Sequence, residues 1–369
     1  MLWSLLYWGI ILVVGATIFG ILFGLRKKLQ NKETNILKIL SLVLAGVFCV
    51  RYLYAHDACE MIFGVTNNSP LASPFLTAVA SLIIWFGCAS LLSIIVYPFF
   101  KLDWLKNLVK FFALPVYILT IGFLIPVFSL IVGENAFSGI NPRLIIYSVE
   151  IGIALAYCLY IFFSKGFFKS TKKDWKVFGI MIVPVLFATM PNYIPQLLLG
   201  PVNVLEEVKD LSVYHRIILY LGVIFPVVLY FLLRNKDKQF VKSVLIFISL
   251  GTMITFCRSY TFEALLLPNN WPLHLCNTAM FLVPLCLIFK LNKLFYFTLF
   301  INVFGAFLAM AMPNYTANFV TSQRVVNFWV NHYIAFFMPI LIVALKVYPR
   351  PKLKQFLHSM VGFFMYFAF

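Results

Sequence analysis

The sequence predicts an all-α, polytopic membrane helix bundle of about twelve spans, and this prediction rests on composition, segment length and charge distribution. Hydrophobic residues make up 63% of the 369-residue chain and charged residues 11%, whereas soluble domains carry roughly 25% charged residues. Apolar runs long enough to cross a bilayer recur along the whole chain. The net charge of +17 does not indicate nucleic-acid binding, because the basic residues lie in short loops and form no basic-aromatic stripe.

Twelve apolar segments follow one another, six in each half of the chain. The first, residues 2–25, lacks a basic n-region and a cleavage site, so we expect a first span rather than a signal peptide. The other predicted spans are 36–54, 74–99, 109–132, 144–163, 177–199, 213–233, 241–257, 271–289, 294–312, 325–347 and 353–369. The last segment has only 17 residues, which predicts a short span or an early end of the chain.

The basic residues predict the orientation of the spans. The odd-numbered loops hold 23 of the 29 Lys and Arg residues. The other six are Arg51, Arg143, Lys209, Arg216, Arg258 and Arg324. Because loops rich in Lys and Arg stay on the cytoplasmic side, we expect an extracytoplasmic N-terminus in a multi-pass protein of the cell membrane.

Two predicted extracytoplasmic corners of the chain are similar to each other. Residues 49–75 read CVRYLYAHDACEMIFGVTNNSPLASPF, and residues 257–281 read CRSYTFEALLLPNNWPLHLCNTAMF. Each has a Cys and an Arg at the end of one span, a Tyr soon after, and NNxPL before the next span. The offset of about six spans predicts two parallel six-helix halves, a divergent one at 1–200 and a second one at 213–369. The alternative is a chance match in a sequence of low diversity.

A second repeated motif, MPNY, occurs at 190–193 and 312–315. Each copy ends a span that is predicted to run outward. One interpretation is a Pro-Asn helix terminator. The other is that Asn192 and Asn314 line a shared polar site.

The chemistry that the sequence suggests lies near the outer face of the second half. A strongly polar residue inside a span is costly, so it marks a site or a buried structural pair. At about 1.5 Å per residue, His274 lies roughly 5 Å, and His332 roughly 10 Å, below the predicted start of its span. Asn314 ends the intervening span at the same level, and Asn331 shares a helix face with Asn327. Further polar residues near these positions are Arg258, Glu263, Cys276, Asn277 and Asn302, while Glu150 lies within the fifth span.

Two histidines and one cysteine are the candidate catalytic residues. His274 or His332 could act as a general base, and Cys276 could act as a nucleophile. On one helix His274 and Cys276 would be about 200° apart, so Cys276 needs His332 or a non-helical start of the span, which Pro272 leaves open. The alternatives are an inert thiol and a hydrogen-bonded histidine pair that only locks the bundle.

Five further residues are candidates for substrate binding: Arg258, Glu263, Asn277, Asn314 and Asn331. Arg258 could hold a phosphate headgroup, and the asparagines could orient a substrate. A structural ion pair at the membrane edge is the alternative for Arg258 and Glu263. No HExxH-type spacing predicts a metal site, and no cofactor is expected.

Three stretches of the second half carry a family resemblance: WPLHLCNTAMFLVPLCLIF (271–289), NVFGAFLAMAMPN (302–314) and NFWVNHYIAFFMPILIVAL (327–345). They resemble the bacterial YwaF-like family of integral membrane proteins. That family is similar in turn to the eukaryotic transmembrane protein 164 family, acyltransferases that move fatty-acyl groups between phospholipids. The usual unit of the family has about six spans, so the first half looks like an extension or a divergent copy.

The resemblance implies that His274, Asn314 and His332 belong to a shared polar centre. For the eukaryotic enzymes it also implies a Cys directly before the first of these histidines as acyl carrier. In this chain that position is Leu273, and Cys276 lies on the other side of the histidine. The chain therefore departs from the family pattern at the residue that would carry the acyl group.

Three functions are compatible with these observations. The first is an enzyme that acts on membrane lipid, a lipid acyltransferase with its site near the outer leaflet. The second is a secondary transporter or small-molecule binding protein with a site between helices of the second half. Intramembrane charges are scarce, with only Glu150 away from the membrane edges, which counts against a transporter. The third is a structural or assembly partner.

Overall fold

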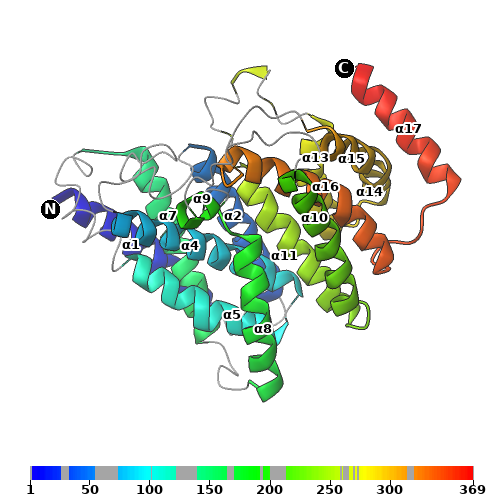
Figure 1. The fold of residues 1–369 in the computed structure, drawn as a ribbon. Coiled ribbons are helices and arrows are strands. Elements are labelled where there is room, and N and C mark those ends of the chain that lie inside the picture. Colours follow the sequence, from blue (N-terminus) through cyan, green and yellow to red (C-terminus); the bar gives the residue numbers. More distant parts are fainter. Residues whose placement is uncertain are drawn as a thin grey trace. The chain divides into compact units, whose positions relative to one another are not determined.

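The computed structural model describes residues 2–25, 33–54, 74–100, 102–121, 139–163, 170–191, 194–199, 213–257, 260, 266–268, 271, 274–313 and 320–368. Within these residues every regular element is a helix (Figure 1). The chain divides into two compact units. Unit 1 comprises Met1–Thr189 and Cys257–Ala264, and unit 2 comprises Met190–Phe256 and Leu265–Phe369.

The described residues of unit 1 form six helical segments along the chain. They are α1 (Leu2–Gly24), α2 (Glu33–Tyr54), α4 (Pro74–Phe100), α5 (Asp103–Leu108) with the π-helix η1 (Val109–Ala113), α7 (Pro142–Phe162) and α8 (Lys172–Ala188). The helix that begins with α5 continues through η1 to Ile121. In this unit α7 packs against α1 and α2, and α8 packs against α5.

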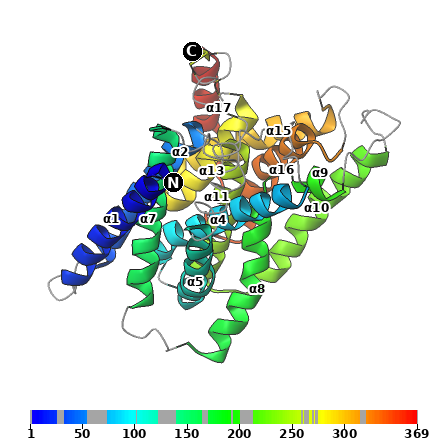
Figure 2. The ribbon, with the colours of Figure 1, turned by 90° about the vertical axis from the view of Figure 1, so that its left-hand side faces the viewer.

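A pair of glycines lets α1 and α7 lie in close contact (Figure 2). A Cβ atom on Gly152 would lie 3.0 Å from the carbonyl oxygen of Ile11, and one on Gly15 would lie 3.4 Å from that of Gly152. Small residues at helix interfaces are typical of membrane bundles, where van der Waals packing replaces the hydrophobic effect between helices. Near the start of α7 the Tyr7 hydroxyl donates to the carbonyl of Gly139 at 3.2 Å, which joins the loop to α1.

Unit 2 has a similar succession of helices after a short first one. They are α9 (Ile194–Leu199), α10 (Val213–Leu233), α11 (Lys238–Cys257), α13 (Leu275–Phe289), α14 (Asn292–Phe297), the π-helix η4 (Thr298–Asn302), α15 (Val303–Ala311), α16 (Gln323–Ala344) and α17 (Leu353–Ala368). Helix α16 packs against α13, α15 and α10, and α17 packs against α14.

Eight helices of the described residues are long and apolar enough to cross a membrane. They are Ser4–Gly24, Ser81–Phe100, Asp103–Ile121, Pro142–Phe162, Val213–Leu233, Lys238–Cys257, Asn292–Ala311 and Gln323–Ala344. The chain is therefore a multi-pass membrane protein with an all-helical fold. Helices that are shorter or less apolar, α2, α8, α13 and α17, lie at the other four predicted spans. The count of twelve spans, their orientation and the two parallel halves stay predictions.

Several predicted spans have different limits in the structure, and two of the differences lie beside prolines. The sixth was expected to continue to Leu199, but α8 ends at Ala188 and α9 is a separate helix. Pro191 follows closely, and proline disfavours helical backbone at the residue before it. The ninth was expected to begin at Trp271, but α13 begins only at Leu275, three residues after Pro272.

Candidate functional site

Two asparagines on different helices of unit 2 bond to each other. Asn331 Nδ2 of α16 donates to Asn277 Oδ1 of α13 at 2.6 Å. Asn331 is buried, with 4% of its surface exposed, and its Oδ1 has no hydrogen-bond partner among the described residues. This hydrogen bond joins α13 to α16 near the start of α13.

A third asparagine lies at the end of the π-helix in the neighbouring segment. Asn302 Nδ2 donates to the backbone carbonyl of Leu275 and, at 2.8 Å, to Thr278 Oγ1. Because a carbonyl can only accept, these contacts fix the orientation of the Asn302 amide. Its Oδ1 is fully buried and lacks a partner within the described part of the chain. A π-turn is rare and is often found at functional sites.

Asn277, Asn302 and Asn331 all bond within the first turn of α13 and are called the asparagine cluster below. His332 follows Asn331 directly on α16. Its Nδ1 is 2.6 Å from the carbonyl oxygen of Phe328, and the two rings lie 4.2 Å apart. Since a carbonyl oxygen only accepts, Nδ1 must carry a hydrogen. In the neutral ring the lone pair is then on Nε2, the atom that can take a proton. The side chain is buried and held in one orientation, as a general base requires.

A second buried histidine, which the sequence interpretation did not include, lies in α10. His215 is fully buried, and its Nε2 is 2.9 Å from the carbonyl oxygen of Met310 at the end of α15. Its ring packs edge-on against Trp329 of α16, with centroids 5.4 Å apart. The sequence does indicate such a role for His215, because a histidine at the third position of an apolar span is costly unless it is hydrogen-bonded. Its contacts join three helices, so His215 stabilises the bundle.

His274 and Cys276 do not form the pair that nucleophilic catalysis would need. His274 has extended backbone and is the N-cap residue of α13, and its side chain is exposed. The expectation that His274 lies below the start of a helix is therefore wrong, because the helix begins one residue later. Cys276 is half-buried next to Gly305, and within the described residues no hydrogen bond joins it to His274 or His332. The expected alternative, a hydrogen bond between the two histidines, is not formed there either.

Three predicted substrate-binding residues, Arg258, Glu263 and Asn314, lie outside the described residues. The same holds for Asn192 of the first MPNY motif. Helices α8 and α15 end at Ala188 and Ala311, just before the two motifs, as a helix terminator would require. In the part of the chain that the structure describes, no three His, Cys, Asp or Glu side chains come together at metal-binding distance.

The cluster and both buried histidines all lie after residue 210. Residues 211–369 match the TMEM164 family. The match covers α10 to α17 and supports the TMEM164-like part of the resemblance, whereas the bacterial YwaF-like assignment stays a prediction. No curated protein and no solved structure matches the chain.

A different polar pair lies in unit 1, which the TMEM164 match does not cover. Arg51 of α2 donates to both carboxylate oxygens of Glu150 in α7, at 2.8 and 3.2 Å. Glu150 is 1% exposed and Arg51 5%. The guanidinium carbon also lies 5.1 and 5.2 Å from the ring centroids of Phe48 and Tyr147. Glu150 and the two aromatic rings thus stabilise the buried charge of Arg51, as expected for a structural ion pair.

Proposed function

We propose that this protein is a lipid-acting acyltransferase of the cell membrane whose site lies at the outer end of unit 2. The observation that carries the proposal is His332, buried in the TMEM164-matched segment with Nδ1 bonded to a carbonyl and Nε2 left as the basic atom. Asn331, the preceding residue of the same helix, and Asn302 of η4 each have a side-chain oxygen with no partner among the described residues. A buried acceptor without a partner costs about 1–3 kcal/mol, which a substrate hydroxyl would recover.

The reaction is a direct transfer of an acyl group from a phospholipid ester to a hydroxyl of a lysophospholipid. His332 Nε2 takes the hydroxyl proton as the oxygen attacks the ester carbonyl carbon. A new ester bond forms, the bond to the donor glycerol oxygen breaks, and the protonated His332 returns its proton to that oxygen. The base is restored, and no other reactant is consumed.

The neighbouring polar residues hold the substrate in this scheme. Asn302 Oδ1 and Asn331 Oδ1 accept from the substrate, and Asn277 holds the Asn331 amide in place. Arg258 holds the phosphate headgroup, Asn314 orients the substrate, and Glu263 is a further substrate-binding residue. Cys276 takes no part in the covalent chemistry of this scheme, because no described histidine bonds to its thiol.

The test is label transfer between lipids. Purified protein in nanodiscs receives a phosphatidylcholine with a deuterated acyl chain and an unlabelled lysophospholipid, and mass spectrometry follows the label. We expect transfer by the wild type and a loss of at least about 100-fold in His332→Ala, the range for removal of a general base. The matched control is His358→Ala on α17, an exposed histidine that should leave the rate unchanged.

Two outcomes would overturn the proposal. The first is no label transfer by the wild type across a panel of donor and acceptor lipids. The second is transfer that His332→Ala leaves intact. Saturable uptake of a solute into proteoliposomes, together with absent label transfer, would favour the transporter alternative.

A further inference from the structure

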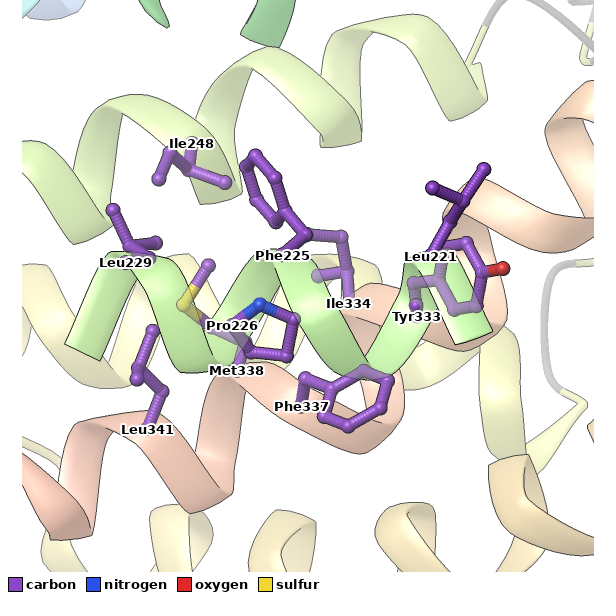
Figure 3. Close-up of a pocket in the computed structure, with 11 residues that line it drawn as sticks. Leu221, Phe225, Pro226, Leu229, Ile248, Tyr333, Ile334, Phe337, Met338 and Leu341 are labelled. Carbon is purple, nitrogen blue, oxygen red and sulfur yellow. The ribbon is translucent and has the colours of Figure 1, made fainter. Parts of the chain in front are cut away.

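Unit 2 contains an elongated apolar cavity between α10, α11 and α16 (Figure 3). Its volume is about 220 Å³, and it is partly open at its side. The labelled side chains come from these three helices and are almost all apolar. They are Leu221, Phe225, Pro226, Leu229, Ile248, Tyr333, Ile334, Phe337, Met338 and Leu341. The hydroxyl of Tyr333 donates to the carbonyl of Ile218, so the ring rather than the polar group faces the space.

The sequence explains why α10 and α16 leave a space here. Pro226 has no amide hydrogen, so the carbonyl of Gly222 loses its helical partner and α10 is weakened at this turn. Gly222 in turn makes room for the Tyr333 ring, because a Cβ atom at this position would overlap the ring carbons. Gly222 thus lets α10 approach the Tyr333 ring, and the cavity begins beside this contact and extends past Pro226.

The dimensions of the cavity fit one extended hydrocarbon chain. Leu221 and Leu229 on α10, and Tyr333 and Leu341 on α16, are each separated by eight helical steps, or about 12 Å along the helix axis. A volume of about 220 Å³ along that length suits a narrow, flexible apolar group. It is too small for a helix, whose diameter with side chains is about 10–12 Å.

The surroundings of the cavity are those of a lipid-facing surface. Leu221 and Phe225 are 57% and 63% exposed, and α10 spans the membrane by length and composition. Bilayer hydrocarbon can therefore enter from the side. Water does not compete, because apolar cavities stay dry and bind apolar molecules.

One stripe of α16 joins the cavity to the asparagine cluster. Asn327, Asn331, Ile334, Met338 and Leu341 recur every three or four residues and so lie along one side of the helix. Two amides occupy its first part, and three cavity-lining side chains occupy the rest. Asn331 and Met338 are about 10 Å apart along the axis. The stripe is thus polar at one end and apolar along the rest, which matches the polar ester end and the hydrocarbon chain of a lipid.

We infer that this cavity binds one acyl chain of a membrane phospholipid. Occupation of the cavity stands on its own geometry, whereas the placement of the ester end at Asn331 rests on the proposed function. Met338, with a flexible thioether, adapts the cavity to saturated or bent chains.

Photocrosslinking tests the inference without any need for catalysis. Protein in phosphatidylcholine nanodiscs receives a phosphatidylcholine with a diazirine midway along one chain, and mass spectrometry maps the labelled residues after illumination. We expect label on Leu229, Met338 and Leu341, in the wild type and equally in His332→Ala. Free fatty acid in excess should not displace it.

Two variants fill the cavity, and one serves as their control. Leu229→Trp and Ile334→Trp should each lower cavity labelling at least tenfold, because the indole occupies the space. Val227→Trp places the same side chain on the opposite, exposed face of α10 and should change nothing. Both cavity positions are only half-buried, so the folded protein tolerates the change.

Several results would overturn the inference. One is label spread evenly over the exposed face of α10, which shows surface lipid alone. Another is equal labelling in the filled variants and in Val227→Trp. A third is displacement by free fatty acid. Cavity labelling without label transfer between lipids would keep this inference and remove the proposed function, whereas transfer without cavity labelling would do the reverse.

Discussion

Each unit has a helix with a buried polar side chain nine residues after its N-cap, but the two side chains are paired differently. In unit 1, Glu150 lies nine residues after the N-cap Asn141 of α7, and in unit 2, Asn331 lies nine residues after the N-cap Ser322 of α16. Glu150 has its charge neutralised by Arg51. Asn331 bonds to another amide and keeps an unpartnered oxygen. A neutralised pair stabilises a fold, whereas an unused acceptor can still bind something.

Other features recur in both units and favour duplication of one six-helix arrangement. Each has a six-residue helix, α5 or α14, followed by a five-residue π-helix, η1 or η4. In each the short helix packs against the last helix of the unit. The units share this local arrangement and differ in how their buried polar side chains are paired. The following predictions test that difference.

The largest effect is expected from breaking the ion pair of unit 1. Arg51→Met or Glu150→Leu alone leaves a buried charge without a partner, which costs about 3–5 kcal/mol. The double variant removes both charges and should be about as stable as the wild type. Thermal unfolding in detergent measures all three. Single variants as stable as the double variant would show that the pair does not neutralise buried charge.

A smaller effect is expected at the equivalent position of unit 2. Asn331→Leu removes one interhelical amide bond, worth about 0.6–2 kcal/mol in membrane bundles, and leaves no charge behind. Its loss of stability should be well below that of Glu150→Leu in the same unfolding assay. An equal or larger loss would mean that the amide pair is as structural as the ion pair.

The sequence predicted the helices better than it predicted their partners. Apolar length placed α10 at Val213–Leu233 and α17 from Leu353, because the bilayer sets a minimum length that composition reveals. It did not pair Arg51 with Glu150 or Asn277 with Asn331, because periodicity gives the face of a helix and not the neighbour that the face meets. The π-turn at Asn302 has no sequence signal of its own.

The smallest effect is expected outside the membrane, at the start of α8. Thr171 and Asp174 form a capping box, and the bonds from Thr171 lower the pKa of the Asp174 carboxyl. Thr171→Ala should cost about 0.5–2 kcal/mol, and Thr171→Ser should restore most of it.

The pH dependence of that cap has a definite sign. A lowered folded-state pKa means that the cap contributes its full stability above the ordinary Asp pKa of about 4 and loses it as the pH falls through the lowered value. The difference in stability between wild type and Thr171→Ala should therefore shrink below about pH 4. A difference that grows on acidification would contradict the assigned bonds.

One measurement directly separates a structural role for the buried ion pair of unit 1 from the proposed action of the polar cluster of unit 2 on lipid. It is acyl-label transfer by the Arg51→Met/Glu150→Leu double variant beside His332→Ala, both in nanodiscs and both confirmed as folded by gel filtration. We predict that the double variant keeps the wild-type rate within about twofold, since both charges are removed together, and that His332→Ala loses about 100-fold or more. Loss of transfer in the folded double variant, with transfer kept in His332→Ala, would contradict the claim.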